Sequence, residues 1–492
     1  MPSQSHRSSS SITSDHEKPP AVTPDQSVTY EEDDLYTRFS PRRKQLITGV
    51  VTYCAFLSPI GSTMITSTIP EVAQYFKTSG SVINASNAVY MLAAGMSPFL
   101  VGQASQVYGR RWVWYDYKAP LSSMDADETI LIIASSLFFA FSIGTALSPN
   151  LASFFIFPYH GTAFLVVGNS CLGDIYTPTE RATGVGWFML GFELGPILGP
   201  LSGGIIVTYC SWRDIFWLQS GLAGLGVALI ILVLPETLSH PQCAQMAHLS
   251  RGDYIRELAR RTSPLRMMRH FRYPNILFAG LGSSALAWNM YSFLTPITYV
   301  LNPRFGLTTP LQSALFYLAP GAGNLVGTFL GGRWADKIVR RCIIKRHGVR
   351  VPEDRLKSCL PFFGILLPAS MLIYGWSVQE SVGGLALPVI MMFLQGFAQL
   401  FVYPSLNTYC LDVMQTQGYG SEIVAGNYFI RYMFAAAGSA ACLPAIEKFG
   451  VGWFTTISVG FLMTSASLIW ATTIWGTQWR VAVEGNKSRG ND

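Results

Sequence analysis

Residues 191–204 read GFELGPILGPLSGG and lie inside an apolar run, residues 183–208, that is long enough to cross a membrane. Glycine recurs at every fourth position, which leaves one side of a helix without side chains. A second helix can pack closely on such a stripe, and prolines within it predict a bend. The positions concerned are Gly191, Gly195, Gly199, Gly203 and the adjoining Gly204, with Pro196 and Pro200 among them.

The whole chain has the composition of an integral membrane protein. Of its 492 residues, 50% are hydrophobic and 13% are charged, whereas a soluble protein has about 25% charged residues. Twelve apolar runs have the length that spans the hydrocarbon core. They are residues 46–67, 83–105, 130–149, 151–173, 183–208, 215–235, 275–300, 312–332, 359–378, 384–406, 424–446 and 453–476. The predicted fold is an all-α membrane protein with twelve transmembrane helices in two six-helix bundles.

The polar stretches predict how the chain is arranged across the membrane. Residues 1–44 form a disordered tail, 45–235 the first bundle, 236–274 a central loop, 275–476 the second bundle and 477–492 a second tail. Of the 34 Lys and Arg residues, four fall in loops on the side opposite the two tails. Because positive charge is retained in the cytoplasm and contacts anionic lipid there, both tails and the central loop are expected to be cytoplasmic.

Two pairs of short motifs recur at matching places in the two halves. GQASQVYGRR (102–111) follows the second span, and GRWADKIVRR (332–341) follows the eighth. NSCLGD (169–174) closes the fourth span, and NTYCLD (407–412) closes the tenth. Two such pairs in register indicate an internal duplication, which is common among transporter folds.

These motifs resemble the major facilitator superfamily, and within it the fungal drug:proton antiporters of the quinidine- and multidrug-resistance type. The resemblance runs from residue 42 to residue 480 and includes GDIYTPTERATGVGWFMLG and GNYFIRYMFAAAGSAA. It implies alternating access, and it assigns residues 191–204 to the antiporter motif. It also assigns the Arg-Arg motifs to a latch between the halves, with topology signalling as the alternative. The latch residues are Gly102, Gly109, Arg110 and Arg111, and in the second half Asp336, Arg340 and Arg341.

Four ionisable residues in or beside the spans are candidates for proton coupling, because such side chains are costly in a membrane. Glu193 lies beside the glycine stripe. Arg431 lies in the eleventh span, where a coupling or substrate site and a structural ion pair with Glu193 or Glu422 are both open. His160 lies in the fourth span, which lacks the Arg usual in the family; a polar helix contact is its alternative role. Asp174 ends that span, either in a charge relay with the latch or as a helix cap.

Polar and aromatic residues in the second half are candidates for lining a substrate cavity. Gln395, Gln399 and Tyr403 recur at every fourth position, and amides at mid-span are expected to avoid lipid. Aromatic walls with few polar anchors suit bulky organic molecules, whereas aromatic residues near span ends also form interfacial belts. The remaining candidates are Trp288, Asn289 and Asn427.

The sequence predicts a monomeric exporter of small organic compounds, such as drugs, a secondary metabolite or an organic acid, in exchange for protons across the plasma membrane. No enzymatic activity, cofactor, metal or nucleic-acid partner is expected, since the chain has no P-loop, nucleophile–base set or metal-ligand spacing. A proton-coupled uptake carrier is one alternative. A non-transporting or defective family member is the other alternative. The polar stretch 115–129 is either a cytoplasmic loop or a gene-model artefact, and an artefact there, like the missing Arg of the fourth span, would favour this alternative.

Overall fold

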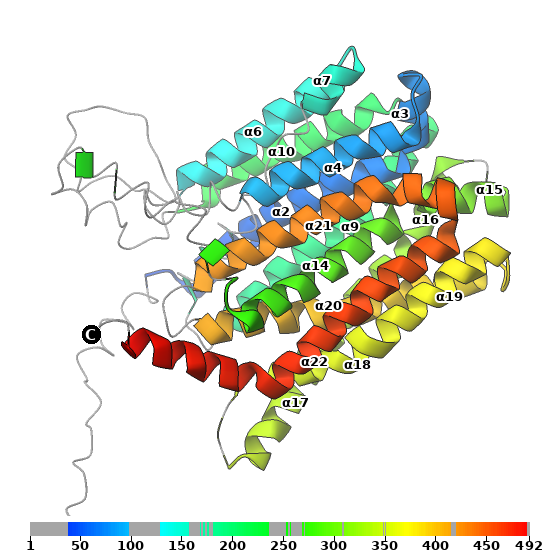
Figure 1. Ribbon diagram of the computed structural model, residues 1–492. Coiled ribbons are helices and arrows are strands. Elements are labelled where there is room, and N and C mark those ends of the chain that lie inside the picture. The colour runs from blue at the N-terminus through cyan, green and yellow to red at the C-terminus, as the bar shows by residue number, and fades with distance from the viewer. Residues whose placement is uncertain are drawn as a thin grey trace, which may run out of the picture.

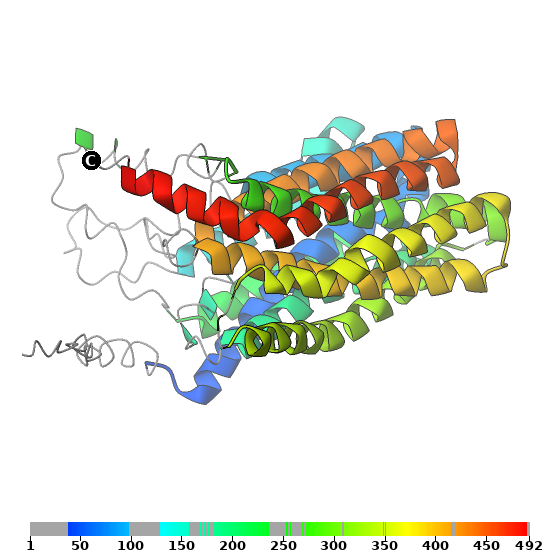
Figure 2. The ribbon, with the colours of Figure 1, turned by 60° about the horizontal axis from the view of Figure 1, so that its bottom comes forward.

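The computed structural model describes residues 38–97, 128–156, 181–235, 271–307, 309–347, 351–414 and 420–489, with a few isolated residues between these ranges. Within these ranges every regular element is a helix. The helix axes are nearly parallel and form one bundle (Figures 1 and 2). The start of the first helix and the end of the last lie at one end of the bundle, which we call the terminal end. We call the opposite end the distal end.

The first half of the chain contributes seven of the described α-helices and one short 3-10 turn. They are α2 (Pro41–Met64), η1 (Ile65–Ser67), α3 (Ile69–Tyr75), α4 (Gly80–Ser97), α6 (Glu128–Ala146), α7 (Leu151–Ile156), α9 (Arg181–Tyr209) and α10 (Arg213–Val233). Helices α3 and α7 lie at the distal end (Figure 1).

The second half follows from residue 274, and two of its described helical stretches contain a short π-helix. The elements are α14 (Pro274–Leu294), η4 (Ile297–Leu301), α15 (Asn302–Phe305), α16 (Pro310–Phe316), α17 (Leu318–Lys345), α18 (Asp354–Pro361), η5 (Phe362–Leu366), α19 (Leu367–Glu380), α20 (Ala386–Met414), α21 (Gly420–Phe449) and α22 (Val451–Arg489). The four-residue helix α15 lies at the distal end (Figure 1).

Eight helical stretches in the described ranges are long and apolar enough to cross a membrane. They are Pro41–Ser67, Gly186–Tyr209, Arg213–Val233, Pro310–Lys345, Asp354–Glu380, Ala386–Cys410, Glu422–Phe449 and Val451–Arg480. Each overlaps a predicted span, while α4, α6 and α14 lie at the second, third and seventh predicted spans. The prediction of an all-helical membrane fold is therefore confirmed.

Two helices extend well past the apolar segments that predicted them. The predicted span 312–332 continues as α17 to Lys345, and the predicted span 453–476 continues as α22 to Arg489. The extension of α17, residues 333–345, contains three Arg and two Lys, which favour helix where no packing decides the conformation. The segment 332–341, which matches the first-half latch motif, is consequently helical.

The largest buried apolar cluster joins the two halves of the chain. It includes Tyr90 and Met91 of α4 together with Tyr291 of α14 and Tyr428 and Tyr432 of α21. Because the cluster bridges helices from both halves, side chains from each half meet in the middle of the bundle.

Candidate functional site

The glycine stripe of α9 packs directly on α2. A Cβ atom at Gly195 would lie 2.5 Å from Pro59 Cγ and 2.7 Å from the Ile60 amide nitrogen, so only glycine allows this approach. The Thr63 hydroxyl donates a hydrogen bond to the Gly195 carbonyl at 3.2 Å. The same exclusion of a side chain by α2 and η1 holds at Gly191, Gly199 and Gly203.

Other positions on α9 contact the second half of the chain. Gly204 lies against Ala314 and the Pro310 carbonyl of α16, with no room for a Cβ atom. Ile197 packs over Gly321 of α17 in the same way. Helix α9 is continuous through both prolines of the motif. It packs against α2 with its glycines and contacts α16 and α17, at the boundary between the halves, with other positions.

A small cavity lies at this boundary. It is lined from the first half by Pro59, Phe192, Glu193 and Pro196, and from the second half by Ala287, Met290, Tyr291, Tyr403, Arg431, Tyr432 and Ala435. The space open to the centre of a water molecule is about 20 Å³, which is enough for about one or two waters and too small for an organic molecule.

Arg431 of α21 is a buried cation held among aromatic rings. Its side chain is only 7% exposed, although it lies in the middle of a helix that crosses the bundle. The guanidinium carbon lies 4.3 Å from the ring centre of Tyr428, 5.2 Å from that of Tyr403 and 5.5 Å from that of Tyr432. The ring of Phe192, on α9, lies at 5.7 Å. Aromatic faces attract a cation and hold it in place without a counter-ion.

No hydrogen bond or ion pair joins Arg431 to any residue in the described ranges. Glu193 lines the same cavity and is 6% exposed, but its carboxylate is not within ion-pair distance of the guanidinium. The carboxylate instead accepts a long hydrogen bond, 3.5 Å, from the Asn324 side-chain amide of α17. The cavity therefore contains a potential anion and a cation that are close but unpaired.

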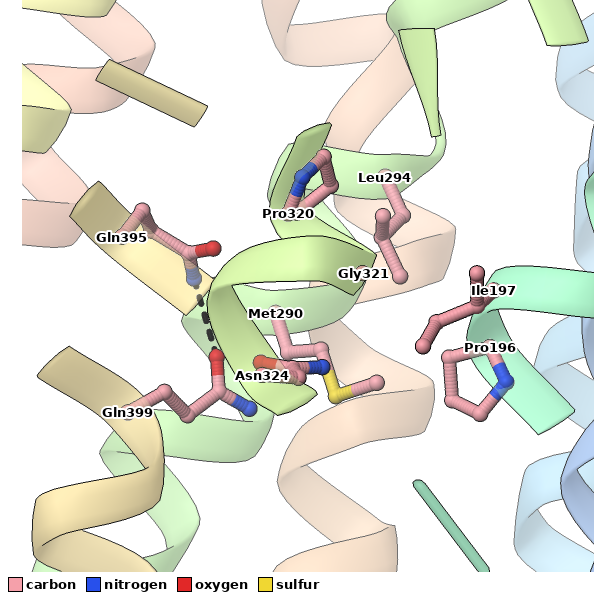
Figure 3. Close-up of a pocket in the computed structure, with 9 residues that line it drawn as sticks. All are labelled: Pro196, Ile197, Met290, Leu294, Pro320, Gly321, Asn324, Gln395 and Gln399. Carbon is pink, nitrogen blue, oxygen red and sulfur yellow. Dashed lines mark hydrogen bonds between the residues drawn. The ribbon is translucent and has the colours of Figure 1, made fainter. Parts of the chain in front are cut away.

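A second cavity adjoins the first, with Pro196 and Met290 lining both. In Figure 3, Asn324 lies between Pro196 of α9 and the two glutamines of α20. Gln395 donates a hydrogen bond to Gln399 at 2.9 Å. The open space, about 10 Å³ at the centre of a water molecule, fits roughly one water.

Helix α20 thus brings three predicted cavity residues to these two spaces. Gln395 and Gln399 line the second cavity, and Tyr403 lines the first, beside Arg431. The amide oxygen of Asn324 is buried and has no partner among the described residues. A water in the second cavity would complete the hydrogen bonding of these amides.

The other predicted cavity residues lie outside both spaces. Trp288 donates its indole N–H to Ser458 of α22 at 3.1 Å. The Asn427 side-chain amide donates hydrogen bonds to Asn407 of α20 at 3.1 Å and to the Ser283 hydroxyl of α14 at 3.4 Å. Asn289 is fully buried, and both ends of its amide lack a partner within the described part of the chain.

The charged residues at the terminal end form ion pairs that differ from the predicted latch. Asp336, Arg340 and Arg341 are exposed on α17, and no ion pair joins them to another described residue. Asp354, by contrast, is fully buried and accepts two hydrogen bonds from Arg346, at 2.5 and 2.7 Å. This contact raises the pKa of Arg346. Further ion pairs here are Lys357–Asp354 at 3.1 Å, Arg355–Asp412 at 3.6 Å and Arg480–Glu353 at 3.7 Å.

Several predicted residues lie outside the described part of the chain. They are Gly102, Gly109, Arg110 and Arg111 of the first latch motif, and the coupling candidates His160 and Asp174. The first-half latch therefore stays a prediction from the sequence.

The structure adds residues to the site that the sequence reasoning did not single out. Phe192, Tyr428 and Tyr432 surround Arg431, and Asn324 contacts Glu193. Asn324 had a usable signal, since it is a lone amide between the glycines of an apolar helix. The aromatic residues had none, because only the packing of helices decides which rings face a cavity.

Contacts between the halves close the distal end. Ser81 at the start of α4 donates a hydrogen bond to Glu447 near the end of α21 at 3.4 Å. One turn deeper, the side chains of Asn84 and Ser439 bond at 3.1 Å. Between α9 and α16, the Thr208 hydroxyl accepts from the Leu311 amide at 3.1 Å. These contacts hold the two halves together on the distal side of the cavity.

A helical membrane bundle with a polar, aromatic-lined cavity between its halves is the arrangement of a transport protein. Residues 127–441 match the Major Facilitator Superfamily, and the chain belongs to this family. It is therefore a multi-pass membrane transporter and not an enzyme.

The most similar relatives include named fungal transporters. The efflux pump radE of Floropilus chiversii is 26% identical over 437 residues, which cover 84% of this chain and 76% of radE. The antiporter QDR3 of Candida albicans is 23% identical over 556 aligned positions, covering 87% of this chain and 77% of QDR3.

Solved structures of distant relatives share the fold. The human organic anion transporter MFSD10 superposes with a TM-score of 0.61 at 16% identity, covering 88% of this chain and all of that one. The xylose transporter XylE from E. coli, in a partially occluded inward-open conformation, gives a TM-score of 0.62 at 15% identity and covers 87% and 98% of the two chains.

Proposed function

We propose that this chain is a proton-coupled exporter of small organic compounds that works by alternating access. The observation that carries the proposal is the pair of buried, unpaired charges, Glu193 and Arg431, in a cavity between the halves. Ionisable groups at that depth are costly unless transport uses them. The names of the fungal relatives, among them an efflux pump, support export as the direction.

The proposed architecture is twelve helices in two six-helix bundles, 45–235 and 275–476, joined by a cytoplasmic central loop. The clustering of Lys and Arg supports placing both termini in the cytoplasm, so that the distal end faces outward. A monomer is the proposed functional unit, since the cavity is built within one chain, and the plasma membrane is its proposed location.

The small size of the cavity supports alternating access. A cavity of one or two waters cannot hold an organic molecule, so the halves must move apart to load one. The distal contacts between α4 and α21 close one route, and rocking of one half against the other would break them. The glycine contacts of α9 with α2 lie within the first half and can stay intact during this motion.

Glu193 is the proposed proton site. Its neighbours are neutral on two sides, with Pro59 from α2 and Asn324 from α17. The titratable and charged groups that line the cavity with it from α14, α20 and α21 are the phenols of Tyr291, Tyr403 and Tyr432 and the cation of Arg431, which Tyr428 contacts in turn. Binding a proton neutralises Glu193 and removes its attraction to Arg431, so protonation changes the charge presented to a substrate.

The test is dye efflux from yeast cells that lack their own exporters and express this chain. Rhodamine 123 and fluorescein are loaded, and efflux is followed at external pH 5 and pH 7. Glu193→Gln cannot gain or lose a proton, so its efflux should stop responding to the pH difference. The control is Glu380→Gln, at an exposed position that ends α19.

A pH response of Glu193→Gln equal to that of the unaltered chain would contradict the assignment of the proton site. Dye entry instead of efflux would indicate an uptake carrier. Movement of neither dye, together with no change in growth on a panel of toxic compounds, would indicate a non-transporting member of the family.

A further inference from the structure

The Arg431 guanidinium has five N–H donors. None of them donates a hydrogen bond to a residue in the described part of the chain. Four aromatic rings surround it at 4.3–5.7 Å and hold it as a cation. The aromatic faces stabilise the positive charge of the guanidinium, but they do not accept hydrogen bonds from its N–H groups. Arg431 is only 7% exposed, and buried N–H donors without acceptors are costly. This arrangement is therefore suited to binding a ligand that supplies the acceptor.

The surrounding groups indicate which acceptor fits. A carboxylate or another planar anion can accept two parallel hydrogen bonds from an arginine. Apart from Arg431 and Glu193, the cavity walls are apolar and aromatic, with Phe192, Met290 and Tyr403 among them. Such walls accommodate a ring system attached to the anion. A cationic compound would instead bring a second positive charge next to Arg431.

We propose that the compounds this transporter carries are organic acids with an aromatic or apolar body, whose anionic group binds Arg431. The proposal rests on the proposed transport function and narrows it to a class of substrate. Arg431 acts as the anion anchor, and Tyr403, Tyr428, Tyr432 and Phe192 orient it and line the apolar part of the site.

The same geometry determines the sign of the proton coupling. Ionised Glu193 and a bound anion compete for the positive charge of Arg431, whereas protonated Glu193 leaves Arg431 free for the anion. Proton and anion binding therefore favour each other, and both cross the membrane in the same direction. The net movement is that of the free acid, and export runs down the concentration gradient of an acid made in the cell. This sign is opposite to the proton exchange that the antiporter motif predicts.

Binding to the purified transporter tests the substrate class without reference to transport. The probes are 1-naphthoate, the neutral 1-naphthamide and the cation 1-naphthylmethylammonium, which share one ring system. Thermal unfolding is followed as each is titrated. We expect 1-naphthoate alone to raise the unfolding temperature, and to do so more strongly at pH 5.5 than at pH 8, where Glu193 competes.

Variants locate the anion on Arg431. Arg431→Gln should weaken 1-naphthoate binding about tenfold or more, because a charged hydrogen-bond donor is lost. Arg431→Lys should retain part of the affinity, since the cation is kept. The control is Arg272→Gln, at an exposed arginine outside the cavity. Equal stabilisation by the amide or the ammonium compound, no stabilisation by any probe, or unchanged binding to Arg431→Gln would overturn the proposal.

Dye efflux separates this inference from the transport function itself. Fluorescein and rhodamine 123 share a ring system and carry opposite charges. We expect the chain to export fluorescein. External acid should slow this export, and Arg431→Gln should abolish it. Export of rhodamine 123 that external acid accelerates would overturn the anion assignment while leaving proton-coupled efflux intact.

Discussion

Arg431 and Glu193 lie in one cavity without an ion pair between them, and this separation has a physical use. A buried ion pair is costly to break, because each partner left alone keeps its desolvation penalty. A transporter must release its ligands in every cycle, so a permanent pair would compete with the substrate. The rings around Arg431 stabilise the charge while leaving its hydrogen-bond donors for a ligand.

Asp354 shows the opposite arrangement at the terminal end, where nothing has to be released. Its carboxylate is fully buried and is bound by Arg346 and Lys357. Arg346, directly after α17, is thereby joined to the start of α18. A charge network of this kind stabilises a turn that has little apolar surface to bury.

Replacing Asp354 by alanine is expected to destabilise the protein. The change removes two charged hydrogen bonds with Arg346, each worth about 1.5–3 kcal/mol before the exposure of Arg346 reduces it. We expect a lower unfolding temperature for the purified protein in detergent. Asp336→Ala is the matched control, since Asp336 is exposed on neighbouring α17 and should leave the unfolding temperature unchanged. Equal effects of the two changes would show that the buried pair does not stabilise this turn.

Glycine stripes decide which helices can touch. On α9 the stripe brings the backbone of α2 within reach, and on α17 Gly327 and Gly331 do the same with α20. A Cβ atom at Gly327 would lie 2.7 Å from the Phe397 carbonyl oxygen. In a membrane, where the hydrophobic effect does not drive helices together, such close backbone packing contributes to the attraction through van der Waals contacts.

Gly195→Ala is expected to destabilise the contact between α9 and α2. The added methyl group would meet the ring of Pro59 and the backbone of Ile60, and such overpacking costs about 1–3 kcal/mol. The unfolding temperature and the monodisperse fraction in gel filtration should both fall. Gly186→Ala, on the same helix with open space around it, should be neutral or slightly stabilising, because alanine favours helix. A neutral Gly195→Ala would mean that the two helices can separate without loss.

Closure of the distal end by α4 and α21 is one of the two states that alternating access requires. Its polar contacts are Ser81–Glu447 at the rim and Asn84–Ser439 below it, and deeper in the bundle Tyr90 and Met91 of α4 pack in the apolar cluster with α21. Hydrogen bonds of this kind contribute about 0.5–1.5 kcal/mol each, so a modest driving force can break them. Opening of the distal end must break these hydrogen bonds and also separate the apolar contacts between α4 and α21.

Cross-linking this gate should stop transport. Ser81→Cys and Glu447→Cys are combined with Cys210→Ser, which removes an exposed native thiol, and are joined by a short dithiol-specific reagent. We expect dye efflux to be lost in the cross-linked cells and restored when a reducible cross-linker is cleaved. Ser81→Cys alone, treated in the same way, should keep its efflux. Full efflux with the two cysteines joined would show that the distal end does not open.

The sequence by itself determined the class of the protein. Apolar runs of membrane length, the asymmetry of Lys and Arg, and glycines at every fourth position predicted an all-helical membrane bundle with a close-packed helix at residues 191–204. These features are local and periodic, so they survive without knowledge of the fold. They also identified Glu193, Arg431 and the stripe of Gln395, Gln399 and Tyr403, because polar groups in apolar helices stand out.

Only the tertiary structure decided what these residues meet. It paired the glycine stripe with α2, placed Tyr403 beside Arg431, directed Trp288 to Ser458 instead of the cavity, and brought Asn324 to Glu193. Three of these four contacts join positions more than a hundred residues apart, and all four depend on how each helix is rotated about its axis. Periodicity predicts which residues share a face, but the packing of all the helices together determines what that face touches.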